Sequence, residues 1–171
     1  MKKCSVGIDI GGTNITVALV TKRGEIVRMN RFPTRPKEGK TKTINRTLKA
    51  IDEIMKGIPL NSIEGIGIGV AGDIDQERGI VRFSPNLSWK NVPMVRLIKK
   101  KFNLRVVVDN DANAAAWGAY VLEDRRKTKN LLCITLGTGV GGGLILNGKI
   151  YHGASGSAGE IGHMTLNPQG E

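Results

Sequence analysis

One strand–turn–strand pattern occurs twice in this chain and restricts its fold more than any other feature. The copies read VGIDIGGTNITVALVTKRGEI, residues 6–26, and LCITLGTGVGGGLILNGKI, residues 132–150. Each has an apolar strand, a turn of glycine and threonine, a second apolar strand, a glycine-containing turn and a third strand. Two copies of one hairpin predict two lobes that face each other. We place the boundary near Asp111, with a first lobe over 1–111 and the start of a second over 112–171.

Strands and helices alternate in the rest of the chain. Residues 43–57 place Ile44, Leu48, Ile51 and Met55 at helical spacing. The segments VPMVRLIKKKF and DANAAAWGAYVLEDRR also predict helices, and IEGIGIGV and LRVVVD predict strands. An antiparallel meander followed by this alternation predicts the α/β class, with a mixed β-sheet and flanking helices.

The composition predicts a globular protein of a reducing compartment. The chain has 171 residues, of which 40% are hydrophobic, so it can bury a core. It has no apolar run of about eighteen residues and no signal-peptide core at its start, so we expect a cytoplasmic protein without a membrane partner. Cys4 and Cys133 are the only cysteines, too few for a disulfide framework or a complete cysteine metal site.

The net charge of +11, from 26 Lys and Arg against 15 Asp and Glu, suits an anionic partner. However, the basic residues are spread over helix faces and loops, and the aromatic fraction is only 4%. We therefore expect no nucleic-acid partner. Solubility or the charged surface of a thermophile's protein would also account for the charge.

The glycine turns of the two copies are candidate phosphate sites. Glycines let backbone N–H groups approach an anion closely, and threonine adds a hydroxyl donor. The turn residues are Gly11, Gly12, Thr13 and Asn14 in the first copy, and Gly137, Thr138, Gly139 and Gly141 in the second. Neither turn has the lysine of a P-loop, and neither opens a helix as a dinucleotide fingerprint does. Taken alone, either is equally typical of a tight hairpin, but a facing pair favours phosphate.

Asp9 ends a buried strand directly before the first turn. An isolated carboxylate there is costly unless it is paired or faces a cation. Magnesium carried by a nucleotide, held through water, is the natural partner. Alternatively, Asp9 accepts hydrogen bonds from the amides of the following turn.

A third group of polar residues, Asp109, Asn110 and Asp111, lies where a strand ends and a helix begins, the usual place for a ligand crevice in α/β sheets. Asp111 is a candidate general base that takes a proton from a substrate hydroxyl as its oxygen attacks a phosphoryl group, an effect of roughly 10²- to 10⁴-fold in rate. The alternative is that Asp111 is an N-cap.

The segment GASGSAGEIGHM, residues 153–164, places Glu160 and His163 three positions apart between glycines. Such a pair suits hydrogen bonding to sugar hydroxyls, or a metal. Taken alone, the pair is weak evidence for a site, and a surface pair is the default explanation.

Five motifs, in order, resemble the ROK family of sugar kinases, which includes bacterial glucokinases and N-acetylmannosamine kinases. They are DIGGTN, GIGIGVAGDID with SPNLSW, NDANAAA, LGTGVGGG and AGEIGH, and the resemblance runs from Val6 to the last residue. It implies the actin/hexokinase-like (ribonuclease H-like) fold and ATP-dependent phosphorylation of a hexose or N-acetylhexosamine hydroxyl.

The resemblance also implies roles for single residues. Gly11 to Asn14 match the family's first phosphate motif and Gly137 to Gly143 its second, while Asp9 matches the carboxylate near Mg²⁺. Asp111 matches the catalytic base. Asn110, Gly72, Glu160 and His163 match residues that contact the sugar. His163 also matches the first ligand of a structural Zn²⁺.

The sequence departs from the family pattern in two places. Asn14 stands where many bacterial members carry lysine, which leaves one phosphate charge unneutralised. The chain also stops at Glu171, before the cysteines that supply the other zinc ligands and before the rest of the second lobe with its adenosine-binding loop. We therefore expect an N-terminal fragment with an incomplete second lobe.

Two further expectations come from the family. Because it also contains transcriptional repressors, the alternative function is a non-catalytic sugar-binding sensor, although a strand begins by Ser5 and leaves no room for their helix-turn-helix domain. Because dimers are common in it, a homodimer is a further expectation.

Overall fold

The computed structural model describes residues 3–122, 128–137 and 139–170. The chain divides into two compact units, Met1–Asp111 and Ala112–Glu171. No helix in the described part of the chain is long and apolar enough to cross a membrane.

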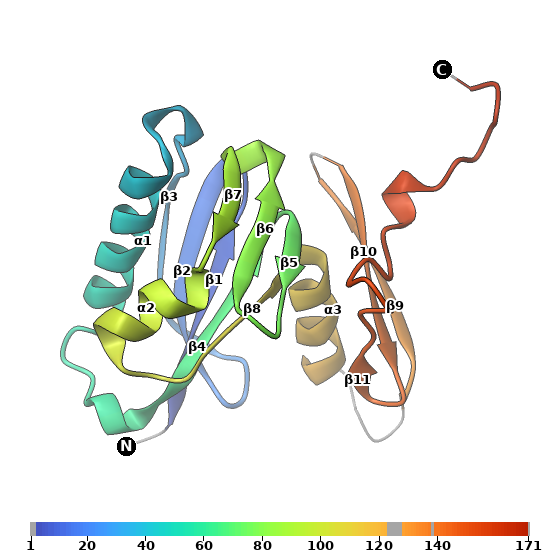
Figure 1. Ribbon diagram of the computed structural model, residues 1–171. Helices are drawn as coiled ribbons and strands as arrows, with labels where there is room; N and C mark the ends of the chain where they lie inside the picture. Colours follow the sequence, from blue (N-terminus) through green and yellow to red (C-terminus); the bar gives the residue numbers. More distant parts are fainter. Residues whose placement is uncertain (1–2, 123–127, 138, 171) are drawn as a thin grey trace. The chain divides into compact units, whose positions relative to one another are not determined.

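The first unit is built on a five-stranded sheet with the order β3-β2-β1-β4-β8 (Figure 1). Its strands are β1 (Cys4–Ile10), β2 (Asn14–Thr21), β3 (Ile26–Pro33), β4 (Ile63–Val70) and β8 (Val106–Asn110). The first three form the predicted antiparallel meander, while β4 pairs in parallel with both β1 and β8. The predicted mixed sheet is therefore confirmed.

Two helices, α1 (Lys40–Met55) and α2 (Met94–Phe102), cover one face of this sheet. Ile8 and Ile10 of β1 lie in one core with Ile51 of α1 and Ile98 of α2. Asp9, between the two isoleucines, belongs to the opposite, exposed face. Strand alternation thus separates an apolar face for packing from an open face that carries polar groups.

The helix α1 begins earlier than the sequence pattern predicts and ends close to the predicted position. It starts at Lys40 rather than Thr43 and ends at Met55, shortly before Gly57. Gly57 has a φ of 78°, a left-handed conformation that favours glycine and stops the helix. Of the predicted apolar stripe, Ile44 and Ile51 are buried, and Leu48 and Met55 pack against the core.

A small second sheet of three antiparallel strands, which the sequence pattern did not predict, completes the first unit. It comprises β5 (Asp73–Asp75), β6 (Ile80–Ser84) and β7 (Trp89–Val92). Ile74, Val81 and Trp89 extend the same hydrophobic core. The strands are too short for a clear alternating pattern, which is why sequence periodicity did not reveal them.

The second unit begins at Ala112, within α3 (Asp111–Leu122), and so contains nearly all of that helix. Its three strands, β9 (Leu131–Leu136), β10 (Val140–Leu146) and β11 (Lys149–Ile150), form an antiparallel sheet. Glycines in β10 let α3 approach closely, because a Cβ at Gly143 would lie 2.6 Å from Cβ of Ala116. Asn147 and Gly148 join β10 to β11 with φ values of 52° and 75°, as a type I′ turn requires.

The strand β9 has one apolar face that is exposed within the described residues. Leu132, Ile134 and Leu136 are 51%, 54% and 81% exposed. They alternate with the less exposed Leu131, Cys133 and Thr135. The second unit therefore packs one face of this strand and leaves the other open.

Core burial in the first unit predicts a large difference between two truncations. Leu19→Ala removes a fully buried side chain of β2 and should lower the free energy of unfolding by about 2 to 5 kcal/mol, because it leaves a cavity. Ile26→Ala, at a position 60% exposed on β3, should change it by about 0.5 kcal/mol or less. Urea denaturation measures both, and equal losses would contradict the packing described.

Candidate functional site

Parallel pairing brings polar residues of three strands to one edge of the large sheet. Asp9 lies opposite Gly69 of β4, and Gly69 lies opposite Asp109 of β8. Parallel strands end at the same edge, so the segments that follow β1, β4 and β8 start side by side. The first glycine turn, the loop with Gly72 and the junction with Asn110 and Asp111 therefore belong to one candidate site.

The first glycine turn is a tight hairpin whose carbonyl groups are held from one side. The N–H of Gly11 donates to the carbonyl of Asn14 at 3.0 Å. Thr34 donates its N–H to the carbonyl of Thr13 at 2.9 Å and its hydroxyl to the carbonyl of Gly11 at 2.7 Å. The N–H groups of Gly12 and Thr13 have no hydrogen-bond partner among the described residues. A tight hairpin and an anion cradle are thus compatible here.

The loop between β6 and β7, which carries the SPNLSW motif, packs against this turn. A Cβ at Gly12 would lie 2.9 Å from Cβ of Asn86, so only glycine allows this approach. The hydroxyl of Ser84 donates to the carbonyl of Ala71 at 2.5 Å and joins the same loop to the segment after β4. Asn86 is exposed beside the turn, a position that sequence reasoning had not assigned to the site.

Gly72 connects the loop after β4 to the junction between β8 and α3. The amide of Asn110 donates to the carbonyl of Gly72 at 3.1 Å. Asp109 accepts a hydrogen bond from the N–H of Asn110 at 2.7 Å and one from the amide of Gln76 at 3.3 Å. Asn110 is therefore held from two sides next to Asp111, which lies in the first turn of α3.

The environment of Asp9 differs from the prediction in one respect. Its side chain is exposed, whereas we expected a buried carboxylate, because Asp9 lies on the sheet face opposite to the core that contains Ile8 and Ile10. The predicted alternative, hydrogen bonds from the turn's amides, is not observed among the described residues. Asp9 therefore remains accessible to a ligand.

Neighbouring charges act on Asp9. Partial desolvation of its carboxylate and the negative charge of Asp111 raise the pKa of Asp9, and Arg31 opposes this rise. Arg31 lies opposite Thr16, which lies opposite Asp9, so the three occupy one row across β3, β2 and β1. Asp9 and Asp111 together form a region of negative charge that would attract a cation.

Metal ligands were predicted at Asp9 for Mg²⁺ and at His163 for Zn²⁺. Among the described residues, no group of three His, Cys, Asp or Glu side chains is placed to hold a metal ion. A magnesium ion keeps several water ligands and needs only one or two carboxylates, so the exposed carboxylate of Asp9 suits it. A structural zinc needs about four protein ligands, which the described residues do not assemble around His163.

The second glycine turn lies in the second unit, between β9 and β10. The N–H of Gly137 donates to the carbonyl of Gly139 at 3.0 Å. Thr138 lies outside the described residues. Gly141 contributes to packing, because a Cβ there would lie 2.6 Å from the hydroxyl of Thr135. A Cβ at Gly139 would meet no atom of the described residues within 4 Å.

Glu160 and His163 lie together at a short 3₁₀ helix (Ile161–His163) of the second unit. Their carboxylate and imidazole are 4.0 Å apart, with exposed side-chain fractions of 45% and 85%. A Cβ at Gly142 of β10 would lie 2.4 Å from the carbonyl of Gly159, so this segment sits tightly on β10. The predicted pair therefore exists and faces solvent from an anchored backbone.

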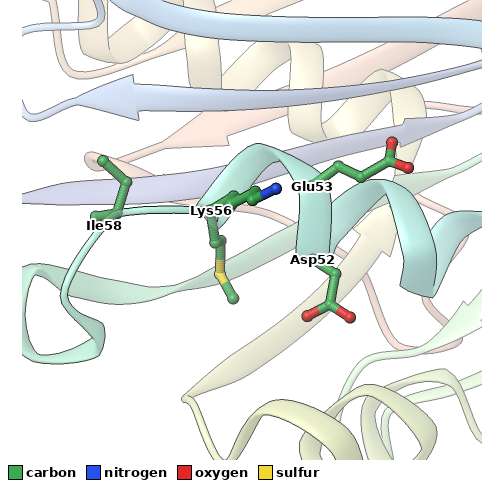
Figure 2. Close-up of a pocket in the computed structure, with 5 residues that line it drawn as sticks. Asp52, Glu53, Lys56 and Ile58 are labelled. Carbon is green, nitrogen blue, oxygen red and sulfur yellow. The ribbon is translucent and has the colours of Figure 1, made fainter.

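A surface depression lies apart from these residues. It is lined by Asp52, Glu53, Met55, Lys56 and Ile58, at the C-terminal end of α1 and just beyond it (Figure 2). The carboxylates of Asp52 and Glu53 point away from each other there, so they do not converge on a ligand. None of the predicted site residues lines this depression.

Comparison with known proteins gives a consistent picture. The model of the ROK family matches residues 5–171. A glucokinase of Halalkalibacterium halodurans is 41% identical over 96% of this chain and 51% of its own length. A xylose repressor of Caldicellulosiruptor bescii is 39% identical over 96% of this chain and 42% of its own length.

Solved structures agree. A ROK family glucokinase from Streptomyces griseus, in complex with glucose and AMPPNP, is 37% identical with a TM-score of 0.86, and the match covers 98% of this chain and 52% of that one. The actin/hexokinase-like fold predicted from the resemblance is thereby confirmed. The chain spans about half the length of the curated relatives it matches.

The conformation of Gly72 predicts a specific sensitivity. Its φ is 147°, and a Cβ there would lie 2.5 Å from the carbonyl oxygen of Phe83. Gly72→Ala should therefore lower the free energy of unfolding by about 1 to 3 kcal/mol, because the loop must move. Gly67→Ala in β4, where a Cβ meets open space, is the matched control and should stay within about 1 kcal/mol. Equal effects in urea denaturation would contradict the close contact.

The raised pKa of Asp9 predicts a pH-dependent effect on stability. Protonation of Asp9 favours the folded state, and this contribution is lost as the pH rises through its folded-state pKa. Asp9→Asn should therefore gain stability relative to the wild type at pH 7 and lose this advantage below about pH 4. Urea midpoints at both pH values measure it, with Glu77→Gln, at an exposed position beyond β5, as the control. An Asp9→Asn difference independent of pH would contradict the prediction.

Proposed function

Because the chain belongs to the ROK family, we propose that it forms the N-terminal part of a kinase that transfers a phosphoryl group from ATP to a hydroxyl of a hexose or N-acetylhexosamine. The observation that carries the proposal is the edge of the large sheet, where Asp9, the first glycine turn, Gly72, Asn110 and Asp111 are assembled in one unit. Similarity to glucokinases over nearly the whole chain supports the same reaction.

The phosphates of ATP would bind at the first glycine turn. The N–H groups of Gly12 and Thr13, which have no hydrogen-bond partner among the described residues, and the N–H of Asn14 suit phosphate oxygens. Asn14 adds an amide without charge where many members of the family place a lysine. The second turn, with Gly137, Gly139 and Gly141, would contribute further backbone donors.

Asp9 would hold Mg²⁺ through water, and the ion would supply positive charge that offsets the charge of the phosphates. Asp9 suits this role because it is exposed and lies near a second carboxylate, Asp111. Arg31, in the same row of the sheet, adds a positive charge on the other side of Asp9.

Asp111 would act as the general base. It would accept the proton of the sugar hydroxyl while that oxygen bonds to the terminal phosphorus and the bond from this phosphorus to the β-phosphate oxygen breaks, releasing ADP. Asn110, held by the carbonyl of Gly72 and by Asp109, would orient the sugar beside the base. Glu160 and His163 would bind sugar hydroxyls from the second unit.

A second candidate function is a sugar-binding sensor without catalysis. Its support is the similarity to xylose repressors, which match this chain at 39% identity and lower. Both functions need a sugar site, but only the kinase needs a base and phosphate contacts. Phosphorylation of a sugar by the purified protein therefore distinguishes them.

The test is an assay of the protein at its natural length, with glucose, N-acetylmannosamine or N-acetylglucosamine and MgATP. ADP formation should depend on one of the sugars. Asp111→Asn should lower kcat by roughly 10²-fold or more and leave sugar binding, measured by calorimetry, largely intact. Asp52→Asn, remote on α1, is the control. Turnover retained by Asp111→Asn would refute the assignment of the base, and sugar binding without any turnover of the wild type would favour the sensor.

A further inference from the structure

Thr34, just beyond the end of β3, contacts the first glycine turn through two hydrogen bonds. It is fully buried, with an exposed fraction of 0%. Its N–H donates to the carbonyl of Thr13 at 2.9 Å, and its hydroxyl donates to the carbonyl of Gly11 at 2.7 Å. One residue therefore holds both ends of the turn.

Thr34 is itself held from behind by α1. Its carbonyl accepts hydrogen bonds from the hydroxyl of Thr43, at 3.4 Å, and from the guanidinium of Arg46. Arg46 also forms an ion pair with Glu38, which lies just before the start of α1. Thr34 is β-branched, which restricts its side-chain rotamers further. The position of its two donors is thus set by the first half of α1.

These contacts determine the direction of two N–H groups. A trans peptide unit is planar, so its C=O and N–H point in opposite directions. The carbonyl of Gly11 points at Thr34, so the N–H of Gly12 in the same peptide unit points away from it. By the same argument, the carbonyl of Thr13 turns the N–H of Asn14 away from Thr34. Both N–H groups consequently point away from Thr34, which leaves them outside its hydrogen bonds to the turn.

We infer that Thr34 is a positioning residue for phosphate binding, which holds the turn so that the N–H groups of Gly12 and Asn14 face the incoming anion. The inference rests on the proposed function, since it takes the turn to be a phosphate site. Such prearranged donors bind an anion without the cost of ordering the loop. Thr34 itself does not touch the phosphate.

The test uses the isotope-labelled protein at its natural length and follows backbone amide resonances during titration with tripolyphosphate and Mg²⁺. Tripolyphosphate carries the phosphate chain of ATP and needs no adenosine pocket. In the wild type, the resonances of Gly12 and Asn14 should shift. Thr34→Val removes the hydroxyl but keeps the shape, and should bind about fivefold more weakly, the effect of one lost hydrogen bond. Thr34→Ser keeps the hydroxyl and should bind within about twofold of the wild type.

Thr47→Val is the matched control. Thr47 is also fully buried, and its hydroxyl donates to the carbonyl of Thr43 at 3.0 Å, within α1. This variant loses a comparable buried hydrogen bond and should bind tripolyphosphate as the wild type does. Equal weakening by Thr47→Val and Thr34→Val would indicate general destabilisation and overturn the inference.

The outcomes separate this inference from the proposed function. If the wild type shifts and Thr34→Val binds equally well, Thr34 does not position the turn, while the phosphate site stands. If the wild type shows no shift at Gly12 and Asn14, the turn is not a phosphate site, and both proposals fail. Should Thr34→Val not fold, Arg46→Gln is the second variant, because it removes the hydrogen bond from the guanidinium to the carbonyl of Thr34. Unchanged tripolyphosphate binding in that variant overturns the inference.

Discussion

Parallel pairing of β4 with both β1 and β8 is the constraint on which the candidate site depends. The register sets Asp9, Gly69 and Asp109 in one row, so that the segments carrying the turn, Gly72 and Asn110 begin at the same edge. Burial keeps this register, because Ile8 and Ile10 lie in the core on either side of Asp9. A slip of one residue would exchange the apolar and polar faces of β1. The same isoleucines that stabilise the fold therefore aim the carboxylate.

The site accepts an electrostatic cost that packing elsewhere must offset. Asp9 and Asp111 are close enough for their charges to interact, and this repulsion adds to the desolvation that raises the pKa of Asp9. Such paired carboxylates are typical of functional sites, where the arrangement is retained for binding or chemistry rather than for stability. Within the proposed kinase, a bound cation and the sugar's proton would each relieve part of this repulsion.

Much of the fold could be predicted because its elements carry long and regular patterns. The meander, the mixed sheet and α1 follow from apolar periodicity, and Asp9, Asn110 and Asp111 stand out as polar residues at strand ends. The short strands β5 to β7 escaped prediction because they show too few alternations. Thr34 and Asn86 escaped because their roles are contacts to the backbone of a distant turn. The exposure of Asp9 depends on which face of the sheet the helices cover, and this could not be predicted from the residues of β1 alone.

The topology of the large sheet also has a consequence for the order of folding. The strands β1, β2 and β3 are joined by short turns. The pairings of β1 with β4 and of β4 with β8 instead join strands that are separated by long segments, which include α1 and α2 respectively. Contacts between residues distant in sequence carry a larger loop-closure entropy and form more slowly. A chain emerging from the ribosome can thus complete the glycine hairpin long before the junction at Asn110 and Asp111 exists. The edge that unites them forms only with β8, the last strand of the large sheet to be synthesised, so a folding intermediate that lacks β8 presents the turn without Asn110 and Asp111.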